Sequence, residues 1–195
     1  TGDLRDDQKL VLETAARLLQ AVIDVISSNG WLAPAVAAME MAQMVTQALW
    51  DRDSQLLQLP HFTKRLAAVA EKQEVEGVFD LMEMEDEDRS QLLEKDGGLS
   101  VAQLSDIAKV CNTYPNIEVQ YDIEDADEIT VGSTIALAVQ LEREGDPTKV
   151  HAPFYPTPKD EGWWLLVGNA KTNELCSIKR VSVAQRGKAR LEFDA

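Results

Sequence analysis

Apolar residues recur at three- and four-residue steps through the first quarter of the chain. Across residues 3–28 they fall on one face of a helix, and charged residues fill the opposite face. Residues 31–50 are apolar around nearly the whole circumference, which predicts a helix packed on several sides around which the fold is organised. Asn29 and Gly30 lie between the two, and Gly30 readily adopts positive φ. We therefore expect an antiparallel helical hairpin.

The pattern becomes shorter after a corner at Pro60. Thr63 and Ser100 are good N-capping residues, and the sequence between Ser100 and Pro115 has helical spacing. Helices are expected at residues 63–72, 75–82, 86–95 and 100–113. They should form a small module with a core of Val78, Phe79, Leu81, Met82, Leu92, Leu93, Leu104, Ile107 and Val110.

Beyond Pro115 the hydrophobic period changes to two residues. Strands are expected at residues 117–124, 134–141, 163–169, 175–183 and 188–194. No helical stretch separates them, so the sheets should be antiparallel and sandwich-like, and the chain as a whole α+β. Trp163 and Trp164 must point to opposite faces. We expect one in the core and the other either covered by a helical module or presented to a partner.

The formal net charge of −15 narrows the function classes. Nucleic-acid binding draws most of its non-specific affinity from Lys and Arg, so an acidic chain without a basic run is a poor primary nucleic-acid binder. Cys111 and Cys176 are far apart, and we expect both to be buried free thiols of a reducing compartment. Neither a membrane span nor a signal peptide is apparent, so an intracellular, soluble chain is expected.

Sequence motifs for catalysis are not found, and we expect no catalytic residues and no cofactor. The phosphate loop, the dinucleotide-binding loop and the serine-hydrolase elbow have no match. His61 and His151 lack partners at ligand spacing, so no zinc site is expected. The acidic run 83–94 partly matches a calcium loop, but Asp88 stands where the turn requires glycine. A solvated helix start is the favoured interpretation, and no metal is expected.

Several long segments carry a family resemblance. They read AARLLQAVIDVISSNGWL, AMEMAQMVTQALWDRDSQLLQLPHF, VFDLMEMEDEDR, CNTYPNIE, VQLERE, EGWWLLVG and SIKRVS. In this order they resemble the C-terminal part of the Sec-homology unit of Ski-like RNA helicases, most closely the C-terminal cassette of spliceosomal members. The resemblance implies a helical bundle over residues 1–60, a helix-loop-helix module over 61–115 and an immunoglobulin-like β-sandwich over 116–195.

The resemblance also implies a role. The chain is expected to be a non-catalytic protein-interaction and regulatory platform at the C-terminal end of a nuclear ATP-dependent RNA helicase that acts in pre-mRNA splicing and spliceosome activation. Its expected partners are spliceosomal scaffold proteins and the active N-terminal cassette of the same polypeptide, with RNA bound weakly and no membrane. Trp163 and Trp164 are candidates for the partner surface.

The family unit has further helices before Asp3 and a further hairpin after the last strand here. We therefore expect a truncated piece of a longer protein, with an uncovered edge and apolar face that lead to self-association.

Two residues of the first helix are candidates for RNA contact. The segment around Arg17 and Gln20 resembles the helix that lies beneath the translocating strand in active cassettes. Those cassettes tend to carry a basic residue near the Gln20 position, so its neutrality weakens the expected contact. Arg17 has the alternative of pairing with Glu13 or Asp24.

Two alternative functions remain open. One is a weak single-stranded RNA-binding module that uses Arg17 and the helix-loop-helix region. The other is the homologous scaffold unit of the endoplasmic-reticulum translocon, which an upstream J-domain with transmembrane helices would distinguish.

Overall fold

The computed structural model describes residues 2–146 and 149–194 and confirms the mixed α+β class. The chain divides into two compact units. The first contains Thr1–Thr46, Pro115–Val150 and Tyr155–Ala195, and the second contains Gln47–Tyr114 and His151–Phe154. The N-terminal helices thus belong with the strands, while the three-module division stays a prediction.

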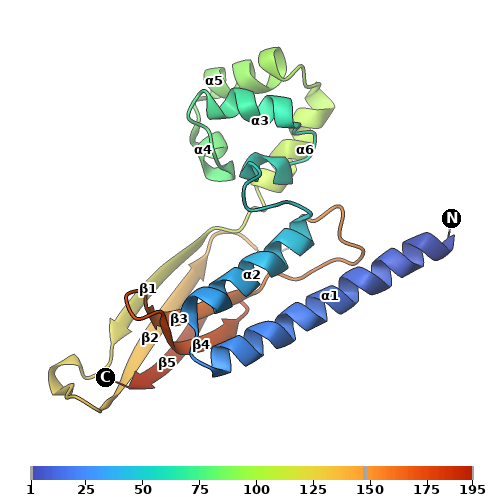
Figure 1. The fold of residues 1–195 in the computed structure, drawn as a ribbon. Helices are drawn as coiled ribbons and strands as arrows, with labels where there is room; N and C mark the ends of the chain where they lie inside the picture. Colours follow the sequence, from blue (N-terminus) through green and yellow to red (C-terminus); the bar gives the residue numbers. More distant parts are fainter. Residues whose placement is uncertain (1, 147–148, 195) are drawn as a thin grey trace. The chain divides into compact units, whose positions relative to one another are not determined.

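The first unit begins with the expected antiparallel hairpin of α1 (Gly2–Ser28) and α2 (Leu32–Gln47), shown in blue in Figure 1. Gly30 has φ of 72°, which confirms the positive-φ turn. The second helix ends three residues earlier than expected, since Ala48 adopts φ of 54° and leaves the helical region.

The expectation that α2 packs on several sides is wrong. Its buried residues, Ala35, Ala38 and Met39, lie on one face. Val36 and Met41 are 37% and 49% exposed. In this unit α2 therefore packs through one face, and the side chains of Val36 and Met41 remain in contact with solvent.

The five strands lie within two residues of the expected bounds. An antiparallel sheet has the order β1 (Ile117–Ile123), β2 (Thr134–Arg143) and β5 (Arg186–Asp194), and β3 (Trp163–Asn169) pairs with β4 (Glu174–Val181) in a second sheet. β5 shows clear alternating burial. β1 does not, because Val119, Tyr121 and Ile123 are 52%, 72% and 38% exposed. A short 3₁₀ turn, η3 (Ala126–Glu128), lies between β1 and β2. The two sheets share a core of Val139, Leu141, Val183, Ala189 and Leu191, which confirms a sandwich.

The β3–β4 sheet has apolar contacts on both faces. Trp163, Leu165 and Val167 pack in the core between the sheets, while Trp164, Leu166 and Ile178 pack on a cluster of Ile23, Ala38 and Met39. The hairpin of helices is fixed to β4 by the backbone, because Leu175 N donates to Gly30 O at 2.8 Å. This unit is therefore built in three layers, with the short sheet in the middle (Figure 1).

The second unit is made of short helices. They are η1 (Gln55–Gln58, 3₁₀), α3 (Lys64–Glu71), α4 (Val78–Glu83), α5 (Asp86–Ser90), η2 (Gln91–Asp96, a π-helix) and α6 (Val101–Cys111). Both expected caps are confirmed: Thr63 Oγ1 accepts from Leu66 N at 3.2 Å, and Ser100 forms a capping box with Gln103. One core fills this unit, namely Leu56, Leu59, Leu66, Ala67, Ala70, Val75, Val78, Leu81, Leu92, Leu93, Ile107 and Cys111.

Two predicted core residues of this module are not buried. Phe79 and Met82 are 40% and 39% exposed. Val78 and Leu81, three residues apart on α4, already occupy the face that meets the core, so their neighbours lie outside it. The Phe79 ring packs instead edge-on against Tyr114, with centroids 5.5 Å apart.

The cysteine prediction is half right. Cys111 is buried at the end of α6, whereas Cys176 is exposed. Leu175 occupies the inward position at the start of β4, so the next residue points the other way. Within the described residues, no helix combines the length and the apolarity that a membrane span needs.

Candidate interaction surfaces

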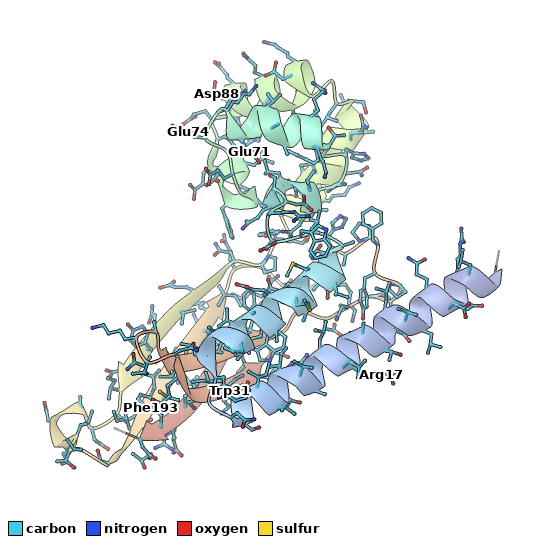
Figure 2. The ribbon with its side chains drawn as sticks, viewed as in Figure 1. Arg17, Trp31, Glu71, Glu74, Asp88 and Phe193 are labelled. Atoms are coloured by element: carbon cyan, nitrogen blue, oxygen red, sulfur yellow. The ribbon has the colours of Figure 1, made fainter. Side chains whose placement is uncertain are left out.

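Arg17 lies exposed on α1, and Figure 2 shows it projecting away from α2. Its two candidate partners are engaged elsewhere: Glu13 lies 4.0 Å from Lys9 Nζ, and Asp24 accepts a hydrogen bond from Gln20 Nε2 at 2.9 Å. Among the described residues, Arg17 forms an ion pair with neither carboxylate. Its guanidinium is therefore available to an outside partner.

Gln20 is joined to a tryptophan by a residue that the sequence did not point to. Gln20 Oε1 accepts from Arg180 Nη1 at 3.0 Å, and the Arg180 guanidinium carbon lies 5.5 Å from the centroid of the Trp164 ring. Such cation–π contacts contribute about 0.5–1 kcal/mol at exposed sites. The structure thus brings Gln20 and Trp164 together, but not Arg17. Strand alternation could have identified Arg180, because it lies two residues after Ile178 and therefore points to the same face of β4.

Trp163 belongs to a buried polar network. Its Nε1 donates to Glu161 Oε1 at 2.8 Å, and the Glu161 carboxylate pairs with Arg143 at 3.0 Å. The side chains of Arg143 and Glu161 are only 1% and 8% exposed. Sequence reasoning missed this pair, although Arg143 continues the inward alternation of Val139 and Leu141. The pair fastens the segment before β3 onto β2.

Both tryptophans of the predicted partner surface therefore take part in internal packing, on opposite faces of β3. The one covered by helices is Trp164, as one of the two sequence alternatives expected. Each ring remains half-buried. A partner contact at these residues stays a prediction.

A row of exposed apolar side chains runs along α1. Leu4, Val11, Leu18 and Val25 follow one another at seven-residue steps and are 75%, 65%, 61% and 62% exposed. Residues seven apart lie on nearly the same face of a helix, and this spacing is typical of helix-on-helix packing. We call these four residues the α1 row. Exposed apolar surface of this kind marks interaction sites.

Among the described residues, no three His, Cys, Asp or Glu side chains gather as metal ligands. His61 Nε2 lies 3.1 Å from Asp106 Oδ2, and the hydrogen bonds with His61 and Lys109 lower the pKa of Asp106. Burial lowers the pKa of His151. The acidic residues 86–88 form the first turn of α5, where carboxylates face the positive end of the helix dipole.

The chain thus combines a three-layer α+β unit with a small unit of short helices. The sequence profile described as the Sec63 Brl domain matches residues 1–195. The chain therefore belongs to the Sec63 Brl domain family.

Similar proteins come from several eukaryotes. The chain is 52% identical over 194 residues to a "U5 small nuclear ribonucleoprotein 200 kDa helicase" of Drosophila melanogaster and 50% identical over 196 residues to the human protein of that name. It is 51% identical over 201 residues to "DExH-box ATP-dependent RNA helicase DExH12" of Arabidopsis thaliana. These matches cover 99–100% of this chain but only 9% of each relative.

Proposed function

We propose that this chain is the Sec63 Brl part of a U5-type spliceosomal RNA helicase and serves there as a non-catalytic platform for protein contacts in the nucleus. Its partners on this proposal are spliceosomal scaffold proteins and the active helicase cassette of the same polypeptide. The names of relatives at 50–52% identity support the spliceosomal setting.

The α1 row is the observation that carries the platform role. Four large apolar side chains, each more than half exposed, line one face of a 27-residue helix. The surrounding chain has a net charge of −15, which opposes a phosphate backbone but not a protein surface. A protein partner that covers the row would gain about 25 cal/mol for each Å² of apolar surface buried.

A pull-down from nuclear extract tests the platform role. The purified chain is the bait, with and without ribonuclease, and mass spectrometry identifies what is recovered. We expect spliceosomal proteins to be recovered on the bait whether or not ribonuclease is present. A triple variant of Val11→Ser, Leu18→Ser and Val25→Ser should lose them, because it removes the apolar surface without changing the charge. Recovery that is equal for both baits would contradict a role for the α1 row.

A second candidate function is weak binding of single-stranded RNA, and the observation that favours it is Arg17, which among the described residues pairs with neither Glu13 nor Asp24. This candidate predicts that oligouridylate binds with an affinity that falls steeply as salt rises. Arg17→Ala should then weaken binding, whereas Arg5→Ala on the same helix serves as the charge-matched control. Recovery of partners that disappears with ribonuclease would favour this function over the platform.

The translocon scaffold has less support. The relatives reported above are named as helicases, and none of their names refers to protein translocation. These names support a helicase setting over a translocation complex in our proposal.

A further inference from the structure

A groove opens within the second unit, lined by α4, the α5–η2 segment and α6. It encloses about 440 Å³. Its floor is apolar and formed by side chains that are at most 9% exposed, namely Leu81, Leu93, Ile107 and Cys111. A volume of this size is within the range of cavities that take up ligands or the anchoring side chains of a partner.

The rim of the groove is open and partly apolar. Met82 contributes from α4 and Ala108 from α6, and both are exposed. Methionine at a surface adapts to partners of different shape because its side chain is unbranched and flexible. An apolar side chain entering here would therefore pass an adaptable edge and reach a preformed floor.

The wall formed by η2 departs from α-helical geometry. Gly97 N donates to Leu92 O at 2.9 Å, five residues back, as expected for a π-helix. Leu93 and Glu94 of this widened turn line the groove. A Cβ at position 97 would lie 2.5 Å from Leu93 O, so only glycine permits this ending. π-turns are frequent at functional sites.

The segment 83–94, which connects the α4 and η2 walls of the groove, is strongly negative, and its Glu94 lines the groove itself. Six carboxylates, of Glu83, Glu85, Asp86, Glu87, Asp88 and Glu94, are all exposed, and Arg89 is the one basic residue among them. The Arg89 guanidinium is already engaged, since it donates to Met82 O at 3.3 Å and to Met84 O at 3.1 Å and pairs with Asp86. The second unit as a whole holds fourteen acidic and seven basic residues. This field repels phosphate and attracts a basic partner.

We propose that this groove docks an amphipathic helical segment of a partner protein, with its apolar side chains on the groove floor and its Lys or Arg side chains against the carboxylates of residues 83–94. Helix-in-groove recognition combines these two features, apolar anchors at three- and four-residue steps and complementary charge at the edge. The proposal deepens the platform function and rests on it for the identity of the partner, but it places a contact on a surface separate from the α1 row.

A synthetic helical peptide provides the direct test on the full chain. The probe is about 16 residues long, roughly four helical turns, with Leu at three- and four-residue steps and Lys elsewhere. Its counterpart has Glu in place of Lys. Fluorescence anisotropy should show binding of the Lys peptide, weakened by salt, and none of the Glu peptide. Equal binding of both peptides would overturn the proposal.

Matched variants on α6 distinguish the groove from general attraction to an acidic surface. Ala108→Trp fills the groove opening, whereas Ala102→Trp lies on the same helix outside it. Neither changes the charge. We expect the first to weaken binding by at least about tenfold, as blocking a central anchor site does, and the second to have little effect. Met82→Gln, a smaller change at the rim, should also weaken binding.

Equal binding by wild-type chain and Ala108→Trp would overturn the groove, and so would competition by oligouridylate at this site. The platform is judged separately by the pull-down. If the peptide does not bind while spliceosomal proteins are still recovered, the groove proposal fails and the platform stands. If the peptide binds while recovery fails, the platform fails and the groove remains a basic-helix site.

Discussion

The two units of this chain bury their apolar side chains in different ways. The smaller unit encloses twelve buried residues in one core, while the larger unit divides eight between two clusters, one on each face of β3–β4. In the larger unit, six of the seven residues of β1 are exposed, and the α1 row faces solvent. A closed core needs nothing outside it, whereas open faces provide surfaces for other proteins. The first unit thus exposes an extended row of apolar side chains, whereas the second unit has a closed core beside a single groove.

The largest expected effect is on the buried ion pair of the first unit. Glu161→Ala removes the carboxylate that faces the buried Arg143 guanidinium, which keeps its hydrogen bond to Glu144 O. Losing one partner of a buried pair lowers the free energy of unfolding by up to about 3–5 kcal/mol. Urea unfolding followed by tryptophan fluorescence reports it, because Trp31, Trp163 and Trp164 all lie in this unit. As a control, Glu142→Ala at an exposed pair with Arg186 should cost no more than about 1 kcal/mol. If both variants lost the same free energy of unfolding, the buried pair would contribute no more to stability than the exposed pair.

The core of the second unit should respond independently of the first. Leu66 is 2% exposed. Leu66→Ala should lower the free energy of unfolding by about 2–5 kcal/mol, because it removes buried apolar surface and leaves a cavity. Hydrogen exchange should rise across α3 and α6 and remain unchanged in β2 and β5. Leu10→Ala, at a residue 60% exposed, is the matched control with little expected change. Faster exchange in both units would contradict their independence.

The same comparison explains what the sequence could predict. Thr63 and Ser100 cap helices through bonds to residues three positions away, and the five strands lie within two residues of the ranges that alternation predicted. Such local signals determined nearly all elements. Phe79 and Met82 were misplaced because burial depends on how much core the unit can enclose, which no local pattern encodes. Cys176 was misplaced because inward and outward positions of a strand depend on its register.

The candidate sites were predicted less well than the fold. The link from Gln20 through Arg180 to Trp164 joins residues about 160 positions apart, a consequence of the first helix packing on β3–β4. The groove depends on a π-turn that ends at Gly97, where helical spacing alone predicts a continuous α-helix. Tertiary packing creates both features, so periodicity could locate their elements but not the sites.

The α1 row should affect association more than stability. An exposed position tolerates a polar residue at a cost within about 0.5 kcal/mol, so Leu18→Ser should leave the free energy of unfolding nearly unchanged. Sedimentation velocity at micromolar concentration should show self-association of the wild-type chain and less of it in the variant. A wild-type chain that sediments strictly as a monomer would contradict self-association through the α1 row.

The smallest expected effect is a pH dependence of stability that differs between the two units. Both histidines, His61 and His151, belong to the second unit. Burial lowers the pKa of His151 below its ordinary value of 6.5, so the folded unit resists a proton that the unfolded chain accepts. Stability from this residue is present above that value and decreases as the pH falls through it, because the unfolded state then binds more protons. Hydrogen exchange at about pH 7.5 and about pH 5.5, corrected for the intrinsic rate, should show a modest loss in α3 and α6 that His151→Gln reduces. Because the first unit contains no histidine, a loss of protection in β2 and β5 as large as that in α6 would break the distinction between the units.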